Sequence, residues 1–289
     1  MSKTVVITGT STGFGRDTAE TLASAGHRVF ATMRDPQGKN SHHAAALGAM
    51  GIYVIEMDVT QDKSVNQAVT HIKTRAEYID VLINNAGLAS AGVSEAFSPA
   101  QMNELFDVNV IGPHRVSRAI LPIMRTQKSG LIINIGSILG RITFPFFGIY
   151  GASKYALEGL SDSLRYEVSQ LGIDVTLVQP SAYPTNMYAS AMEPVDKQCI
   201  SEYGTTGEIP QAMFVQFMSM FEADNGPNLH DVAQAIVELI EAPNGKRPAR
   251  KVVGTSFGAD AINSAVAPIQ QQTIKALGLE HLEAVNTTL

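Results

Sequence analysis

The sequence contains no tryptophan and a single cysteine, Cys199, among its 289 residues. One cysteine excludes an internal disulfide and suits a reducing compartment. No apolar run approaches the length of a membrane-spanning helix, and the apolar run at residues 5–7 is too short for a signal peptide. These absences predict a cytoplasmic protein without a membrane span.

Charged residues are also few, at 17% of the chain, and the formal net charge is −6. A mildly acidic chain gives no support for nucleic-acid binding or for docking on an anionic membrane. The chain has no internal repeat, no low-complexity tract and no linker-like change of composition. With 45% hydrophobic residues it can form a proper core. We therefore expect one globular domain over residues 1–289.

Short β-branched runs alternate with longer helical patterns almost from end to end. Several runs are apolar without alternation, as expected for strands covered on both faces. Strand–helix alternation predicts right-handed crossovers, and hence a Rossmann-type α/β fold with a doubly wound, mainly parallel seven-stranded sheet. The expected strands are 4–8, 28–33, 52–57, 81–84, 131–136, 174–179 and 251–253, and the expected helices lie near 13–25, 62–76, 99–127, 150–171 and 229–242.

Two segments interrupt this alternation. Residues 182–228 are rich in Met, Phe, Tyr and Pro, and so long a connection predicts a functional flap over a substrate. Residues 256–289 form a tail with a weak helical pattern at 261–277, which we expect to be a packing extension.

A glycine-rich turn, TGTSTGFG at residues 8–15, follows the first expected strand and opens the first expected helix. Gly9 permits a tight turn, and Gly13 lets backbone N–H groups approach a pyrophosphate. Gly15 allows close helix–strand packing, and the helix N-terminus adds partial positive charge. At a strand–helix junction this pattern predicts dinucleotide binding rather than a bare turn.

Tyr150 and Lys154 are four residues apart at the start of an expected helix and share one face. A tyrosine with a pKa of about 10 is a poor base, but a nearby ammonium favours the phenolate and should lower that pKa. Such a tyrosine can give a proton to a carbonyl oxygen or take one from an alcohol. The pair alone is better explained by an ordinary amphipathic helix with Lys154 in solvent. Ser137, at the carboxyl end of strand 131–136, favours catalysis because its hydroxyl can fix a substrate oxygen.

The glycine spacing resembles the TGxxxGxG turn of the short-chain dehydrogenase/reductase family, and the resemblance extends over about residues 4–185. Each motif is short, and their occurrence together in the family's order makes the match specific. The matching positions are the adenine-pocket pair Asp58-Val59, the NNAG box Asn84-Asn85-Ala86-Gly87 and the catalytic residues Asn109, Ser137, Tyr150 and Lys154.

The resemblance implies hydride transfer between a nicotinamide and a carbonyl or alcohol, with Tyr150 as general acid/base. It implies that Lys154 also binds the nicotinamide ribose, and that homodimers or homotetramers form through the helices near 99–127 and 150–171. No metal site is expected. The residues expected to bind the dinucleotide are Gly9, Ser11, Thr12, Gly13, Phe14, Gly15, Arg34, Asp58, Val59, Asn85, Ala86, Gly87, Tyr150, Lys154, Pro180 and Thr185.

Two positions need comment within this match. Pro113 cannot donate to the carbonyl of Asn109, four residues earlier, so that carbonyl is free for another partner or merely marks a kink. The resemblance implies that the main chain of Asn109 holds a water of a proton relay. Ser181 replaces the glycine of the family's Pro-Gly-x-x-x-Thr motif, in which Thr185 would contact the nicotinamide amide.

The residues that follow the second strand bear on the choice of dinucleotide. An acid usually ends this strand and binds the ribose 2′-hydroxyl, but Met33 occupies that place. Arg34 offers a planar cation suited to a 2′-phosphate, and hydroxyls of the glycine turn can assist it. Asp35 fits an ordinary turn; alternatively it binds the ribose and selects NAD(H). We expect NADP(H), with NAD(H) as the less favoured cofactor.

The flap and the segment between Ser137 and Tyr150 are rich in methionine and aromatic residues, which adapt to bulky apolar ligands. Any one of them is more simply a packing residue, but the set predicts a lipophilic ketone, aldehyde or secondary alcohol as substrate. No arginine or lysine lies in 182–196 to clamp a small anion. By composition the flap is similar to that of steroid- and retinoid-active family members. The expected substrate residues are Leu139, Phe144, Phe147, Met187, Met192 and Phe217.

Two other functions are weighed against an oxidoreductase. A dinucleotide-binding sensor or interaction protein would keep the fold and be expected to lack Tyr150 or Lys154, yet both are present. A sugar-nucleotide epimerase or dehydratase would resemble TGxxGxxG in its turn and usually carry a larger substrate domain, which the spacing from Gly9 to Gly15 disfavours.

Overall fold

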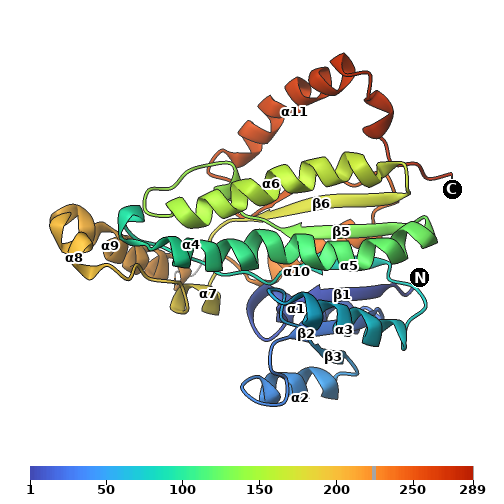
Figure 1. Ribbon diagram of the computed structural model, residues 1–289, viewed down its shortest axis with the longest axis horizontal. Coiled ribbons are helices and arrows are strands. Elements are labelled where there is room, and N and C mark those ends of the chain that lie inside the picture. The colour runs from blue at the N-terminus through green and yellow to red at the C-terminus, as the bar shows by residue number, and fades with distance from the viewer. Residues whose placement is uncertain (223–225, 289) are drawn as a thin grey trace.

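Parallel strands form one seven-stranded sheet in the order β3-β2-β1-β4-β5-β6-β7. The computed structural model describes residues 1–222 and 226–288, and helices cover both faces of the sheet (Figure 1). The predicted doubly wound α/β fold is confirmed. The strands are β1 (Thr4–Thr8), β2 (Arg28–Met33), β3 (Tyr53–Glu56), β4 (Val81–Asn84), β5 (Gly130–Ile135), β6 (Ile173–Pro180) and β7 (Arg250–Val253).

Alternate side chains of the central strands enter two separate cores. Val5 and Ile7 of β1 lie in a cluster with α1 (Gly13–Ser24) and α10 (His230–Glu241), while Val6 points to the opposite face. There it packs with residues of three other helices. All three side chains are fully buried. The continuous apolar run of the strand is thus explained by burial on both faces. The helices of the second face are α3 (Asp62–Lys73), α5 (Gly112–Gln127) and α6 (Gly148–Ser169).

The expected helix over 99–127 contains an irregular turn. It begins as α4 (Pro99–Phe106), continues through a π-helical segment at Asp107–Ile111 and ends as α5. Gly112 N–H donates to the carbonyl of Asp107, five residues earlier. Because Pro113 has no N–H to give to Asn109, the regular hydrogen-bond ladder cannot pass this point. The irregularity predicted from Pro113 is therefore present.

One helix near the site has no counterpart among those expected from the sequence. This is α2 (Ser41–Ala49), between β2 and β3. Only Leu47 of this helix is buried, so its segment SHHAAALGA carries almost no apolar periodicity. The helix nevertheless brings His43 toward the carboxyl end of β2.

The flap consists of three helices, α7 (Asn186–Ala189), α8 (Lys197–Glu202) and α9 (Thr205–Phe221), at one end of the molecule (Figure 1). No residue of α9 is buried, although the helix is largely apolar. Residues 223–225 of the expected flap lie outside the described residues. No helix in the described ranges is both long and apolar enough to span a bilayer.

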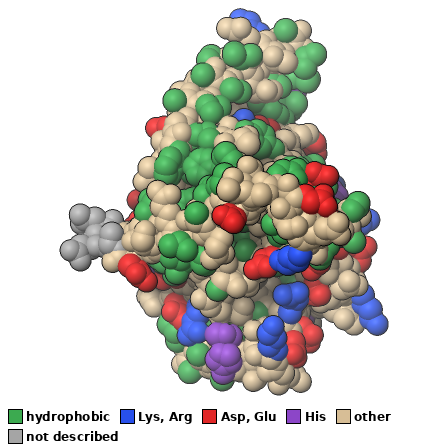
Figure 2. Space-filling model, turned by 90° about the vertical axis from the view of Figure 1, so that its left-hand side faces the viewer, with side chains coloured by type: hydrophobic (Ala, Val, Ile, Leu, Met, Phe, Trp, Pro, Cys, Tyr) green, Lys and Arg blue, Asp and Glu red, His purple; other side chains and the backbone are tan. Residues whose placement is uncertain are grey.

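The tail forms α11 (Ala259–Ala276), which projects from the body (Figure 1) and bears many of the hydrophobic side chains at the top of Figure 2. Beyond it the chain returns to the body, where Asn286 N–H donates to Ser169 O at 2.9 Å and Val285 is buried. The expected packing extension therefore touches the domain mainly through its two ends. Leu289 lies outside the described residues.

Asp174 on β6 joins the sheet to the loop before β7. It is fully buried, and its Oδ2 accepts from Gly245 N at 2.8 Å and from Arg247 Nη1 at 2.6 Å. Arg247 also donates to Leu239 O on α10, and its side chain is 9% exposed. A buried ion pair of this kind stabilises little against an apolar alternative, but the loss of one partner leaves an uncompensated charge.

We therefore expect Asp174→Ala to lower the free energy of unfolding by about 3–5 kcal/mol, because Arg247 stays buried without its partner. Urea unfolding followed by circular dichroism measures the loss. The control is Glu193→Ala, which breaks an ion pair with Lys197 whose side chains are 80% and 66% exposed, and it should change stability by less than about 1 kcal/mol. Equal effects of the two variants would contradict the expectation.

Candidate active site

The glycine turn joins β1 to α1 and closes against β4. A Cβ on Gly9 would lie 2.7 Å from Ala86 Cα, and one on Gly15 would overlap Gly9 O and Asn85 Nδ2. Gly9 and Gly13 also have φ values of +71° and +59°, which favour glycine. Side chains at these positions would therefore force the turn open or distort it.

The side chain of Asn85 holds this turn in place through hydrogen bonds. Its Nδ2 donates to Thr8 O at 2.8 Å and to Gly9 O at 3.0 Å, while Thr8 Oγ1 accepts from the backbone N–H groups of Asn85 and Ala86. The NNAG box thus holds the glycine turn in place. The side-chain amide of Asn85 is engaged with protein carbonyls rather than pointed into solvent.

A crevice of about 730 Å³ runs along the carboxyl ends of the strands in front of this turn. Thr185 is one of its lining residues. Gly15 is absent from the lining because it packs behind the turn, where its missing Cβ is needed. The other expected dinucleotide residues that line the crevice are Gly9, Ser11, Thr12, Gly13, Phe14, Arg34, Asp58, Val59, Asn85, Ala86 and Gly87.

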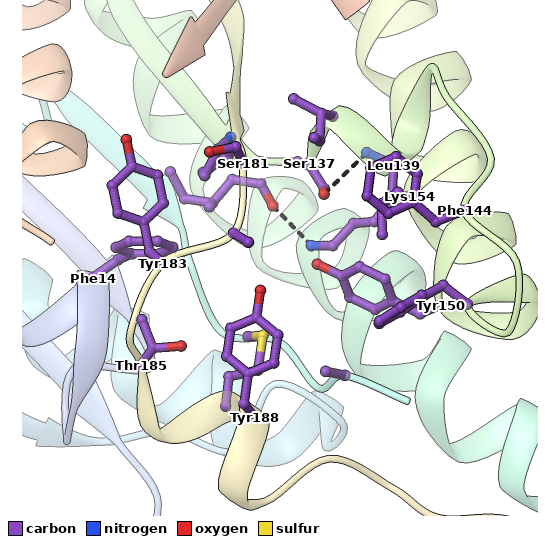
Figure 3. Close-up of a pocket in the computed structure, with 18 of the residues that line it drawn as sticks. Phe14, Ser137, Leu139, Phe144, Tyr150, Lys154, Ser181, Tyr183, Thr185 and Tyr188 are labelled. Carbon is purple, nitrogen blue, oxygen red and sulfur yellow. Dashed lines mark hydrogen bonds between the residues drawn. The ribbon is translucent and has the colours of Figure 1, made fainter. Parts of the chain in front are cut away.

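A second cavity, apolar and of about 90 Å³, adjoins the crevice, and Thr185 and Phe14 line both. Ser137, Tyr150 and Lys154 lie in this second cavity together with Pro180. Figure 3 shows the hydroxyl groups of Ser137 and Tyr150 and the ammonium of Lys154 pointing toward the same space. The residues that the sequence assigns to reaction and to dinucleotide binding are therefore brought together at one junction.

Local backbone geometry fixes the three reacting side chains. Ser137 caps the short 3-10 turn Ile138–Gly140, and its Oγ accepts from Leu139 N at 3.1 Å. Lys154 is 5% exposed; its Nζ donates to Ile135 O at 3.0 Å and lies 5.6 Å from the centre of the Tyr150 ring. One face of α6 thus presents the tyrosine and the lysine to the end of β5.

The protonation of this pair differs from the sequence-based expectation. Burial raises the pKa of Tyr150 to about 12, while its hydrogen bond with Ser137 acts in the opposite direction. Burial also lowers the pKa of Lys154 to about 8. The expected lowering of the tyrosine pKa by the lysine is therefore not found in the protein alone, because desolvation outweighs it.

Asn109 lies in the π-helical segment and is 1% exposed. Its side chain makes a pair of 2.8 Å hydrogen bonds with the backbone of Leu88, and its Nδ2 also donates to Ser153 Oγ at 3.1 Å. Asn109 thereby joins the loop after β4 to the helix that carries Tyr150. The side chain of Asn109 therefore has a structural role. The water-holding role that the resemblance implies concerns the main chain of Asn109 and does not involve this side chain.

The far end of the crevice, beyond β2, is basic. Arg34, Lys39 and His43 line it, and Figure 2 shows basic and histidine side chains gathered on the lower part of this face. The Asp35 carboxylate accepts from the backbone N–H groups of Gly38 at 3.0 Å and Lys39 at 2.7 Å. Asp35 therefore builds the turn that the sequence predicts for it.

Lys39 and His43 were missed by sequence reasoning because they belong to the loop before α2 and to α2 itself. Burial lowers the pKa of His43, assisted by the neighbouring His42 and Arg16. The only signal in the sequence was the gathering of basic and histidine residues within ten positions of Arg34.

Five of the six expected substrate residues lie in the lining of the apolar cavity: Leu139, Phe144, Phe147, Met187 and Phe217. Met192 does not line it. Its backbone N–H donates to Ala89 O at 2.8 Å, and it forms a bridge with Ser90 that ties the flap to the loop after β4. This bridge holds the flap backbone at Met192 beside the loop after β4, and Met192 therefore stays outside the cavity lining.

Three aromatic residues of the cavity were not among the expected substrate residues: Tyr183, Tyr188 and Phe257. The hydroxyl of Tyr188 points into the cavity opposite Tyr150 (Figure 3), and burial and the nearby Tyr150 raise its pKa. Its ring contacts Phe217 and Phe221 of α9. The aromatic composition of the flap was the signal that pointed to this region.

Ser181 takes the place of the glycine in the loop after β6. Its N–H donates to Val253 O at 3.0 Å, so the strand pairing continues past Pro180. A Cβ on Gly254 would lie 2.5 Å from Ser181 Oγ and 2.7 Å from Tyr183 Oη. The serine is accommodated because the facing residue is a glycine, and Thr185 still reaches both cavities.

Comparison with known proteins gives one consistent family. The family model described as short chain dehydrogenase matches residues 3–196. The chain is 35% identical over 252 residues to 3-ketodihydrosphingosine reductase of Bacteroides thetaiotaomicron, covering 86% of this chain and 87% of that one. It is also 35% identical over 249 residues to human retinol dehydrogenase 8, covering 83% and 78% respectively.

Solved structures agree with this family. A short-chain dehydrogenase from Streptomyces avermitilis is 29% identical with a TM-score of 0.75, and the match covers 96% of this chain and 97% of that one. A short chain dehydrogenase/reductase from Burkholderia phymatum in complex with NAD is 25% identical with a TM-score of 0.73, covering 93% and 95%. A metagenomic short-chain oxidoreductase in complex with NADP is 25% identical with a TM-score of 0.66, covering 87% and 96%. The chain belongs to the short-chain dehydrogenase family and is an oxidoreductase of that family.

Proposed function

We propose that this protein is an NADP(H)-dependent oxidoreductase that moves a hydride between the nicotinamide and a lipophilic ketone, aldehyde or secondary alcohol. The observation that carries the proposal is the position of Ser137, Tyr150 and Lys154 where a dinucleotide-sized crevice meets an apolar cavity. Hydride transfer needs the substrate carbon and the nicotinamide at one such junction, screened from water.

The crevice fits a dinucleotide. The glycine turn leaves room for a pyrophosphate because a Cβ on Gly13 would meet only Thr185, at 3.7 Å, and nothing nearer. The N-terminus of α1 adds its partial positive charge at the same place. Asp58 and Val59 would line the adenine, while Lys154 and Thr185 would hold the nicotinamide half. Once bound, the nicotinamide supplies the hydride or accepts it.

The protein's own groups manage the proton. Ser137 would donate a hydrogen bond to the substrate oxygen, and Tyr150 would give its proton to that oxygen during reduction. With a pKa of about 12, Tyr150 is protonated at neutral pH and is ready to act as the acid. Oxidation needs the phenolate instead, so its rate should rise with pH. The charged form of Lys154, favoured below pH 8, stabilises that phenolate.

NADP(H) is favoured over NAD(H) by the basic end of the crevice. Arg34, Lys39 and His43 line it, and the carboxylate of the neighbouring Asp35 is occupied by two backbone N–H groups. An acid engaged in a turn is poorly placed to bind a ribose 2′-hydroxyl, whereas a guanidinium suits a 2′-phosphate.

A lipophilic substrate is favoured by the lining of the second cavity, in which apolar side chains such as Phe144, Phe147 and Phe217 predominate over polar ones. The names of two relatives, 3-ketodihydrosphingosine reductase and retinol dehydrogenase 8, also refer to lipophilic molecules. At about 90 Å³ the cavity is small, so a large substrate requires α9 to move aside. That helix has no buried residue to hold it.

Homodimer or homotetramer formation and a cytoplasmic location stay predictions. Pairing through α5 and α6 is supported by an apolar groove between them, lined by Leu121, Leu157, Leu160 and Leu164. Leu160 is 45% exposed, which a partner helix would reduce.

A substrate screen tests the main proposal. Hydrophobic ketones, aldehydes and secondary alcohols are offered with NADPH/NADP⁺ and NADH/NAD⁺, and the absorbance of the reduced cofactor is followed. We expect turnover of the hydrophobic carbonyls with NADPH, because apart from the reacting Lys154 no lysine or arginine lines the cavity to clamp a small anion. A preference for small charged keto acids would remove the lipophilic assignment.

Tyr150→Phe separates an enzyme from a dinucleotide-binding sensor. The variant keeps the ring in the cavity and loses the proton donor, so kcat should fall by about 100-fold or more while NADPH binding, measured by fluorescence, stays within about twofold. Unchanged turnover would show that Tyr150 is not the acid. Binding without turnover in the wild type would support the sensor.

Arg34→Asp tests the choice of cofactor. Loss of a cation and gain of an anion beside the 2′-phosphate should shift the ratio of kcat/KM for NADPH and NADH toward NADH by about 100-fold, or about 3 kcal/mol. Arg118→Asp makes the same charge change on α5, away from the crevice, and should leave the ratio unchanged. An unmoved ratio in Arg34→Asp would overturn the NADP(H) assignment.

Burial of Lys154 should also make the stability of the folded protein depend on pH. Between pH 8 and 10.5 the unfolded chain holds a proton on this lysine that the folded chain has lost, so the free energy of unfolding rises with pH in that window. Lys154→Met lacks this contribution. The stability of wild type minus that of Lys154→Met should therefore increase by roughly 2–3 kcal/mol from pH 8 to 10, measured by urea unfolding.

The matched control for this measurement is Lys251→Met, because the side chain of Lys251 is 41% exposed and water reaches it in the folded protein. The difference in free energy of unfolding between wild type and Lys251→Met should change much less over the same pH range. If the free energies of unfolding of the two lysine variants changed in parallel with pH, burial would not destabilise the charged form of Lys154 as expected.

A further inference from the structure

Glu158 is a buried carboxylate that the proton chemistry above does not use. It lies on α6 one helical turn beyond Lys154 and is 3% exposed. A charged group is costly to bury unless it is paired and hydrogen-bonded. The partners of Glu158 therefore indicate what its burial achieves.

Both carboxylate oxygens of Glu158 are engaged. Oε2 accepts from Arg250 Nε at 2.7 Å and pairs with Arg141 Nη2 at 3.2 Å, while Oε1 accepts from Gln179 Nε2. Asp162, four residues further along α6, binds the other end of the Arg250 guanidinium. Two carboxylates thus balance two guanidinium groups. We call these residues the Glu158 cluster: Arg141, Glu158, Asp162, Gln179 and Arg250.

The Glu158 side chain supports the loop that carries Ser137. A Cβ on Gly140 would lie 3.0 Å from Glu158 Cγ, and one on Gly136 would lie 3.8 Å from Glu158 Oε1. Arg141 follows the 3-10 turn directly and is pulled to the same carboxylate. The loop is therefore held on Glu158 at both sides of Ser137.

The cluster also reaches the loop after β6. Gln179 is fully buried and immediately precedes Pro180, which lines the apolar cavity. The Oε1 of Gln179 accepts from Asn263 Nδ2 of α11 at 2.7 Å, so its amide is fixed at both ends. One carboxylate thus connects α6 with the Ser137 loop and with the end of β6.

We propose that Glu158 is a positioning residue that sets the Ser137 loop against α6, and with it the placement of the Ser137 hydroxyl relative to Tyr150. The proposal rests on the proposed function, in which these two hydroxyl groups share the substrate oxygen. Misplacement of a reacting group by about 1 Å can cost on the order of 100-fold in rate, so the rigidity of this loop matters for catalysis.

Glu158→Gln tests the proposal because it keeps the size of the side chain and removes its charge. With the charge gone, Arg141 and Arg250 lose their common partner and the loop relaxes. We expect kcat to fall by about 10- to 100-fold, with KM for NADPH within about twofold of wild type. The matched control is Asp162→Asn, which removes a carboxylate from the same Arg250 but lies 3.9 Å from Arg141, farther than Glu158, and its kcat should stay within about twofold. A kcat for Glu158→Gln within twofold of wild type would overturn the proposal.

A double-mutant cycle with Ser137→Ala distinguishes positioning from a general loss of structure. If Glu158 acts through Ser137, adding Glu158→Gln to Ser137→Ala lowers kcat no further. Additive losses would mean that Glu158 merely supports the fold, and they would reject a positioning role.

Circular dichroism and thermal unfolding establish that each variant is folded at the assay temperature. If Glu158→Gln does not fold, Arg141→Met relaxes the same loop from its outer end and should give the same non-additivity with Ser137→Ala; additivity would again reject the proposal. A failure of the proposed function is recognised separately, because then the wild type shows no turnover or Ser137→Ala has no effect.

Discussion

Parallel pairing of β1 through β7 makes all the strands end at one edge of the sheet, and the placement of every candidate functional residue depends on this. Helices cover both faces, so backbone and side chains just past the carboxyl ends are the ones left free for chemistry. The glycine turn and the NNAG box begin on the last residues of β1 and β4, Ser137 lies two residues after β5, and Pro180 is the last residue of β6. The crevice and the apolar cavity are two parts of this one edge.

Burial of charge is the second constraint on the site. Lys154 is buried beside Tyr150, and its Nζ donates to the carbonyl of Ile135. Glu158, one turn away, is equally buried but is neutralised by two arginines. The same helix therefore holds a lysine whose pKa is lowered by burial and a carboxylate that two guanidinium groups hold in place. A reactive group and a rigid support need these opposite environments.

The strands, the doubly wound topology and the glycine turn could be predicted from local sequence. Strands buried on both faces appear in the sequence as continuous β-branched runs, and the turn appears as glycines at a fixed spacing. Other features depend on contacts that no local pattern records. The helix α2 packs through Leu47 alone, and Lys39 and His43 come with it. Met192 turns away because of a backbone bridge to Ser90. The upward shift of the Tyr150 pKa comes from desolvation by distant segments, which the neighbouring lysine in the sequence cannot reveal.

The contact between Ser181 and Gly254 links two positions that are 73 residues apart in the chain. Gly254 has a φ of +81°, and a side chain there would meet both Ser181 and the buried ring of Tyr183. A serine at 181 is thus compatible with this backbone only while 254 stays a glycine. The two positions are therefore coupled despite their distance in the chain, because any side chain at 254 competes with the Ser181 hydroxyl for the same space.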